Sequence, residues 1–122
     1  MTPNEFQQAA LRTAPSATQN EKSQYLLYQS RQILDLLHAG IGMCTETGEF
    51  QDALKKHIFY GQPLDILNLK EELSDVMWYV ALGAEAAGTS IENLMIGVIN
   101  KLKARYPDSF SEEYAAKRLD KQ

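Results

Sequence analysis

The amino-acid sequence predicts an all-α fold: a four-helix-bundle-like core of long antiparallel helices, with short peripheral helices at the N- and C-terminal ends. Ala, Leu, Glu, Lys and Gln, which favour helices, dominate the chain. Apolar residues recur every three or four positions through its central part, and the strict alternation typical of a half-buried strand is absent. Ser, Thr and Asp precede several of these stretches, where their side chains would cap a helix.

Size and composition favour one domain in a reducing compartment. A chain of 122 residues with 44% hydrophobic residues is long enough for one compact core and too short for two. We expect a single domain over residues 1–122, with its core at about residues 20–106. The lone Cys44 has no disulfide partner, and we expect it to be a small buried residue.

Charge and hydropathy argue against two classes of partner. The net charge of −4 disfavours binding to a nucleic acid polymer, which is contacted by clustered Lys and Arg. The longest apolar run, residues 76–84, is far shorter than the roughly 20 residues that cross a bilayer. The first residues also lack the pattern of a signal peptide. We therefore expect a cytoplasmic protein that does not enter membranes.

The N-terminal third contains two helix starts. A Thr-x-x-Glu capping box at residues 2–5, with Pro at the first helical position, predicts a short helix over residues 3–12. The small and polar residues 13–17 predict a loop. A second capping box at residues 18–21 then opens a long helical segment.

From Ile33 onward, the two sides of this segment differ in character. The apolar stripe keeps its phase through Gly40 and Gly42, so both glycines are expected at points of close helix packing. The stripe consists of Ile33, Leu37, Ile41, Cys44 and Gly48. The opposite side carries Gly42, Glu46, Glu49 and Ala53, where small residues beside carboxylates leave the open volume that a binding site needs.

A loop over residues 57–65, marked by Gly61 and Pro63, leads to the next helix, which Asp65 is expected to cap. The apolar stripe of that helix consists of Leu69, Leu73, Val76, Val80, Ala84 and Ala87. Its other side carries Asn68, Glu72, Asp75, Tyr79 and Ala86. The carboxylates of both helices therefore lie on the less apolar sides.

Two further helices complete the prediction. Gly88 is expected to end the preceding helix, and Thr89 or Ser90 to cap the next one. The core positions of that helix are Ile91, Leu94, Met95, Val98 and Leu102. It stops at Pro107, and Ser111 is expected to cap a short amphipathic helix near the C-terminal end.

Two pairs of carboxylates are the strongest functional signal. Glu46 with Glu49, and Glu72 with Asp75, are each three residues apart, which places both members of a pair on one patch of a helix. Carboxylates on buried helices are costly, and a divalent cation held between two antiparallel helices would offset that cost. Four carboxylates form an oxygen-ligand set that suits Mg²⁺ or Mn²⁺ and does not suit zinc. The alternative is that both pairs belong to solvated helix faces.

Other polar and aromatic residues have weaker signals. Lys101 and Arg105, one turn apart, would either neutralise phosphate oxygens or complement the helix dipole. The composition around Trp78 and Tyr79 favours core packing over a base-stacking platform. His38 follows Asp35 by three residues, as in di-iron bundles, but such a site needs two of these motifs; we interpret His38 as a structural or supporting residue.

The order of these motifs resembles that of the MazG-like all-α nucleoside triphosphate pyrophosphohydrolases, a superfamily related to dimeric dUTPases. The resemblance rests on Glu46-Thr-Gly-Glu49, on Glu71-Glu72-Leu-Ser-Asp75, and on the Lys-x-x-x-Arg-Tyr-Pro run that begins at Lys101. It covers about residues 38–110. Thr45 and Val98 depart from the Glu and Asn that are common at their positions, and neither is an expected metal ligand.

The resemblance implies a Mg²⁺-dependent enzyme, with Mn²⁺ as a substitute, that hydrolyses an NTP or dNTP to the monophosphate and pyrophosphate in nucleotide-pool housecleaning. It implies that Glu46, Glu49, Glu72 and Asp75 hold the metal, and that Lys101, Arg105 and Tyr106 bind the substrate's phosphates. Glu49 is our choice, on position alone, for the base that accepts the proton of the attacking water. The resemblance also implies a homodimer or homotetramer. The rival interpretation is a non-catalytic helical module that binds nucleotide or serves in assembly.

Overall fold

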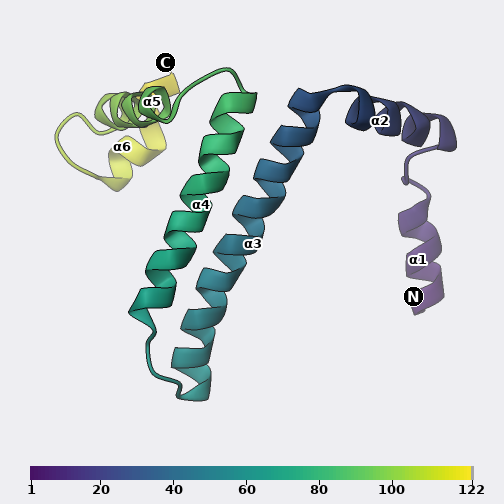
Figure 1. Ribbon diagram of the computed structural model, residues 1–122, viewed down its shortest axis with the longest axis horizontal. Coiled ribbons are helices and arrows are strands. Elements are labelled where there is room, and N and C mark those ends of the chain that lie inside the picture. Colours follow the sequence, from purple (N-terminus) through teal and green to yellow (C-terminus); the bar gives the residue numbers. More distant parts are fainter. Residues whose placement is uncertain (122) are drawn as a thin grey trace. The chain divides into compact units, whose positions relative to one another are not determined.

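The computed structural model describes residues 1–121, and within that range it contains helices and no strand (Figure 1). The elements are α1 (Pro3–Leu11), α2 (Ala17–Gln29), α3 (Arg31–Tyr60), α4 (Ile66–Ala86), α5 (Ile91–Arg105), α6 (Glu112–Lys117) and a final 3₁₀ turn, η1 (Leu119–Lys121). The all-α prediction is confirmed. The chain divides into two compact units, Met1–Leu34 and the part from Asp35 onward. The single-domain organisation stays a prediction.

The N-terminal unit contains α1, α2 and the first residues of α3. Helix α1 begins as predicted, because Thr2 and Glu5 form a reciprocal capping box. Helix α2 begins earlier than predicted, at Ala17, because Ser16 forms its capping box with Gln19. The Thr-x-x-Glu spacing at residues 18–21 is therefore not the helix start; both residues lie inside α2, whose N-terminus Ser16 already caps.

The predicted long helix is interrupted at Ser30. This residue has an extended backbone, with φ −115° and ψ 108°, and it ends α2. Its Oγ accepts a hydrogen bond of 3.2 Å from the backbone N–H of Ile33, so its side chain caps the start of α3. One serine thus separates two helices that the hydrophobic pattern alone would join.

Helices α3 and α4 lie side by side as an antiparallel pair (Figure 1), and small residues lie at their contact. Ala39 and Gly42 of α3 are buried. A Cβ atom at Gly42 would lie 2.2 Å from two ring carbons of Tyr79, and a Cβ at Gly83 would lie 3.3 Å from that of Ala39. Close packing at Gly42 is therefore confirmed. At Gly40 the prediction is wrong, because a Cβ there would meet nothing within 4 Å.

The caps around α4, α5 and α6 follow the sequence closely. Asp65 Oδ1 accepts a 3.0 Å hydrogen bond from the backbone N–H of Asn68 at the start of α4. Gly88, with φ +72°, follows the end of α4, a left-handed conformation that glycine adopts without a steric penalty. Ser90 caps α5 and Ser111 caps α6. Helix α5 packs against α4, α6 and η1.

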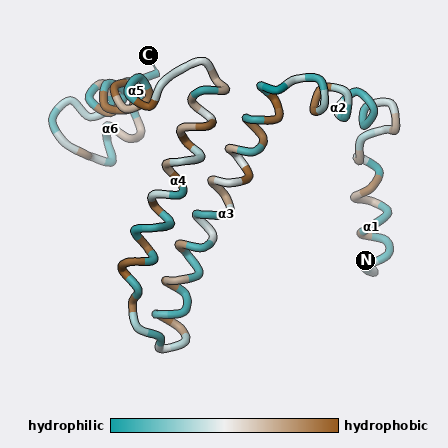
Figure 2. The backbone as a smooth tube through the Cα atoms, viewed as in Figure 1, coloured by the Kyte–Doolittle hydropathy of each residue, from teal (hydrophilic) through white to brown (hydrophobic). Residues whose placement is uncertain are grey.

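The predicted apolar stripes are mostly exposed in the single chain. Figure 2 shows hydrophobic residues recurring along α3, α4 and α5. Only Ala39, Leu69 and Ala84 are buried hydrophobic residues in the described part of the chain. The expectation of a buried Cys44 is wrong, because that residue is exposed. A pair of helices buries only the facing strip of each, so the remaining apolar faces stay open.

Among residues 1–121, none of the helices combines the length and apolar character that crossing a membrane requires.

Candidate functional site

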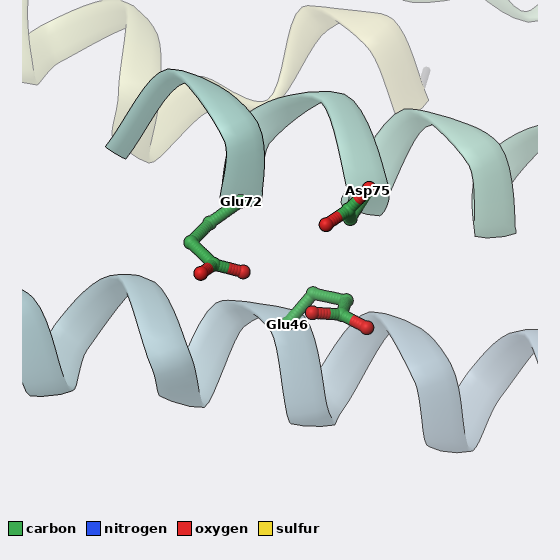
Figure 3. A group of neighbouring side chains, drawn as sticks. All are labelled: Glu46, Glu72 and Asp75. Atoms are coloured by element: carbon green, nitrogen blue, oxygen red, sulfur yellow. The ribbon is translucent and has the colours of Figure 1, made fainter. Parts of the chain in front are cut away.

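Three of the four predicted metal ligands converge between α3 and α4. Glu46 projects from α3 towards Glu72 and Asp75 on α4 (Figure 3). One carboxylate oxygen from each of the three lies within 4.8 Å of the others. The two carboxylates of each helix lie three residues apart and therefore on one side of that helix. When α3 packs against α4, these two sides meet, and carboxylates that are far apart in sequence form one patch.

Glu72 is the most unusual member of this group. Its exposed fraction is 7%, and its Oε2 atom is buried without a hydrogen-bond partner in the described structure. Burial raises the pKa of Glu72 above its ordinary value, and the charge of Glu49 and a hydrogen bond with Glu46 raise it further. A carboxylate with an unpaired buried oxygen among like charges is stabilised by a cation at that position.

Glu49 lies outside the group of three but beside it. Its side chain is exposed on α3, and it lines a pocket together with Glu72. We call this the turn-side pocket; its other lining residues used below are Asp52 and Lys56 on α3, Gln62 in the connecting loop and Asn68 on α4. Glu49 therefore adjoins Glu72 without belonging to the group of three.

An aromatic cluster lies on the other side of the carboxylates. Trp78 and Tyr79 line a second pocket with Glu46 and Asp75. The Trp78 and Tyr79 rings meet edge to face at a centroid separation of 5.0 Å, and the His38 ring lies 5.7 Å from that of Tyr79. The interpretation of Trp78 as a core residue is wrong for the single chain, since its exposed fraction is 58%. The interpretation of His38 as a structural or supporting residue stays a prediction.

The three predicted phosphate-binding residues lie at the C-terminal end of α5. Lys101 is exposed, while Arg105 and Tyr106 are partly buried. Tyr106 packs against Phe110 at 5.3 Å between ring centroids. None of the three lines either pocket at the carboxylates, so within the described residues the chain does not bring the two groups together.

Arg105 has a partner that the sequence did not reveal. Its Nε and Nη2 donate hydrogen bonds of 2.7 and 2.9 Å to the two carboxylate oxygens of Asp120, whose side chain is 2% exposed. These hydrogen bonds hold the pKa of Asp120 well below its ordinary value, and they raise the pKa of Arg105 above its ordinary value. Residues 105 and 120 are joined only by tertiary packing of η1 on α5, so no periodicity or capping signal predicts the contact.

Sequence reasoning also missed most of the turn-side pocket. Asn68 was placed on the carboxylate side of its helix, which its spacing of four residues from Glu72 makes visible. Lys56 lies on the same side of α3 as Glu49, which their spacing of seven residues also makes visible, whereas Gln62 reaches the pocket only because of the loop conformation after α3. A loop conformation of this kind is not encoded in any periodic pattern.

Comparison with known proteins agrees with the geometry. The family model of the MazG nucleotide pyrophosphohydrolase domain matches residues 39–110, which contain the converging carboxylates, both pockets and α5. Searches among curated proteins and among solved structures found no match.

Proposed function

We propose that this protein hydrolyses a nucleoside triphosphate to the monophosphate and pyrophosphate in a Mg²⁺-dependent reaction. The premise is that the chain belongs to the MazG nucleotide pyrophosphohydrolase domain family. The observation that carries this proposal is the buried carboxylate oxygen of Glu72 that has no hydrogen-bond partner, in a residue grouped with Asp75 on the same helix and with Glu46 on α3. It supports a cation site at the place where the family's acidic motifs meet.

The donor atoms fit a hard divalent cation. Glu46, Glu72 and Asp75 offer carboxylate oxygens only, and no Cys or His belongs to the group, so Mg²⁺ or Mn²⁺ suits it better than zinc. Glu49 would complete the ligand set from the adjoining turn of α3. Bound there, the ion supplies charge neutralisation of the polyphosphate and a water of lowered pKa.

The protein's own residues then divide the remaining tasks. Glu49 is exposed at the edge of the group and accepts the proton of the attacking water. Lys101, Arg105 and Tyr106 contact substrate phosphates. Asp120 accepts from two of the five N–H donors of Arg105 and fixes the plane of its guanidinium group, so at most three donors remain for an anion.

Assembly into a homodimer or homotetramer is part of the proposal. The exposed apolar residues Leu37 and Ile41 on α3 and Met77 on α4 form surfaces that a helical partner would cover. The proposal includes that α5 of one copy completes the carboxylate site of another, since the phosphate-binding residues line neither carboxylate pocket of their own chain. A cytoplasmic location fits the unpaired Cys44.

The assay that tests the activity measures pyrophosphate release from a panel of canonical and modified NTPs and dNTPs. We expect one pyrophosphate per monophosphate formed with Mg²⁺, and loss of turnover when EDTA removes the ion. Release of orthophosphate and a diphosphate would contradict the proposed reaction. No turnover, together with a rise in melting temperature on adding nucleotide, would favour the non-catalytic binding module instead.

Sedimentation velocity at micromolar concentration tests the assembly. We expect the protein to sediment as a dimer or tetramer, and Leu37→Glu and Ile41→Glu to increase the monomer fraction, because each puts a charge on an apolar face. Gln51→Glu is the control, since it adds the same charge at an exposed position that is already polar. A wild-type protein that sediments only as a monomer would contradict the assembly.

A further inference from the structure

The turn-side pocket extends the carboxylate site towards the α3–α4 connection. It has a volume of about 460 Å³, within the range of small-molecule sites. Glu49 and Glu72 line its metal-side end, and the rest of the lining includes Lys56, Gln62 and Asn68. A substrate whose phosphates lie at the carboxylates therefore has adjoining space for another part of the molecule.

The loop that closes this pocket is held in place. The Nδ1–H of His57 donates a hydrogen bond of 2.7 Å to the backbone carbonyl of Gln62. The backbone N–H of Gln62 donates to the carbonyl of Lys56 at 3.2 Å. Asp65 caps the N-terminus of α4 next to Asn68. The far wall is thus a fixed surface, which recognition by hydrogen bonds requires.

The charges lining the pocket disfavour phosphate there. Glu49, Asp52, Asp65 and Glu72 contribute carboxylates, and Lys56 is the single cationic side chain among the described lining residues. That ammonium is already paired with Asp52, at 2.6 Å between Nζ and Oδ2. No aromatic ring belongs to the described lining, so stacking does not account for the pocket either. Polar groups that carry no negative charge fit this surface.

We propose that the turn-side pocket receives the nucleoside of the substrate, and that Lys56 and Asn68 select a base that carries a carbonyl oxygen. This inference rests on the proposed function. An ammonium only donates hydrogen bonds, and Lys56 has two N–H donors left beside the one directed at Asp52. The Asn68 amide both donates and accepts, and the carboxylates accept from sugar hydroxyls. Adenine, which has no carbonyl oxygen, leaves the Lys56 donors without that acceptor.

Lys55 provides a matched control for Lys56. Both ammonium groups pair with Asp52, Lys55 at 3.2 Å, and their exposed fractions are 54% and 48%. Lys55 lines a different pocket, with Ile58 and Phe59 on the outer side of α3. Lys55→Met and Lys56→Met therefore remove the same charge from neighbouring positions, and only the second changes the turn-side pocket.

The experiment compares guanosine, uridine and adenosine nucleotides. Calorimetric titration with the three monophosphates in Mg²⁺ measures binding, and kcat/KM for the triphosphates measures turnover. We expect the wild type to favour the guanosine or uridine nucleotide over the adenosine nucleotide by about tenfold, the effect of one hydrogen bond to a charged group. Lys56→Met should remove this preference, Asn68→Ala should reduce it, and Lys55→Met should retain it.

Each result decides the inference. A wild-type protein without preference between carbonyl-bearing bases and adenine overturns it, as does a preference that survives Lys56→Met. If Lys55→Met and Lys56→Met reduce the base preference equally, the inference is also overturned, because the effect would then reflect net charge alone. The monophosphate titration separates this outcome from failure of the proposed function: absence of triphosphate turnover contradicts the hydrolase, while the binding preference still tests the pocket.

Discussion

Glu72→Gln is expected to abolish turnover and, in the metal-free protein, to raise the melting temperature. The first effect follows from loss of a charged ligand at the centre of the carboxylate group; we expect activity to fall by at least about a hundredfold, since even supporting residues of metal sites have effects of that order. The second follows because the amide removes a buried negative charge that lies near Glu46, Glu49 and Asp75. Glu49→Gln should also abolish turnover.

The stability effect depends on pH in a defined direction. The pKa of Glu72 is raised in the folded protein above its ordinary value of 4.5. Above about pH 4.5 the unfolded chain releases this proton before the folded one does, so the stability of metal-free wild type falls as pH rises towards the folded pKa. Glu72→Gln lacks this loss of stability, so the difference in melting temperature between the two metal-free proteins should grow over the same pH interval.

Thermal unfolding between pH 4 and 8 in EDTA measures the pH dependence of stability, and the same scans in Mg²⁺ measure stabilisation by the ion. Mg²⁺ should raise the melting temperature of wild type more than that of Glu72→Gln, because the ion binds the folded carboxylates. Glu71→Gln is the control, since Glu71 is the exposed neighbour of Glu72. Full activity in Glu72→Gln, or a melting temperature below that of metal-free wild type at neutral pH, would contradict the assignment.

Gly42→Ala is expected to destabilise the protein, whereas Gly48→Ala is expected to stabilise it. Both glycines lie inside α3, where alanine favours the helix by about 0.5–1 kcal/mol. At Gly48 the added Cβ meets nothing within 4 Å, so this gain remains. At Gly42 it would lie 2.2 Å from the Tyr79 ring, and displacing a packed ring costs about 1–3 kcal/mol.

Gly42→Ala should also weaken metal binding. Gly42 lies one turn before Glu46, and Tyr79 one turn after Asp75, so their contact sets the separation of α3 and α4 beside the carboxylates. Circular-dichroism melting of both variants measures stability, and Mg²⁺ titration of turnover measures ion binding. Equal melting temperatures for Gly42→Ala and Gly48→Ala would show that Tyr79 does not hold the helices at this distance.

The sequence predicts those features of the fold that depend on neighbouring residues. Asp65, Ser90 and Ser111 cap helices as expected, because a cap involves only the next three residues. Glu46, Glu72 and Asp75 converge as expected, because the spacing within each pair fixes its side of the helix. The start of α2 was misplaced because two overlapping capping boxes, at Ser16 and Thr18, satisfy the same pattern.

Features set by tertiary packing were beyond the sequence. Periodicity identified the apolar stripe containing Ile41 and Cys44, but it does not say whether the same chain covers that stripe. The Arg105–Asp120 pair and the turn-side pocket join residues through a chain reversal and a loop, whose geometry no local rule determines. The charge of Arg105 was visible, and its partner was not.

The packing of α5 against α4, α6 and η1 has a consequence for how the chain reaches this structure. All three contacts join elements that are close in sequence. Proteins dominated by such local contacts fold quickly, because little loop entropy is lost before each contact forms. In the proposed assembly, a second molecule would cover the apolar faces left open on α3 and α4. Folding of each chain would then be fast and independent of concentration, whereas assembly would slow with dilution.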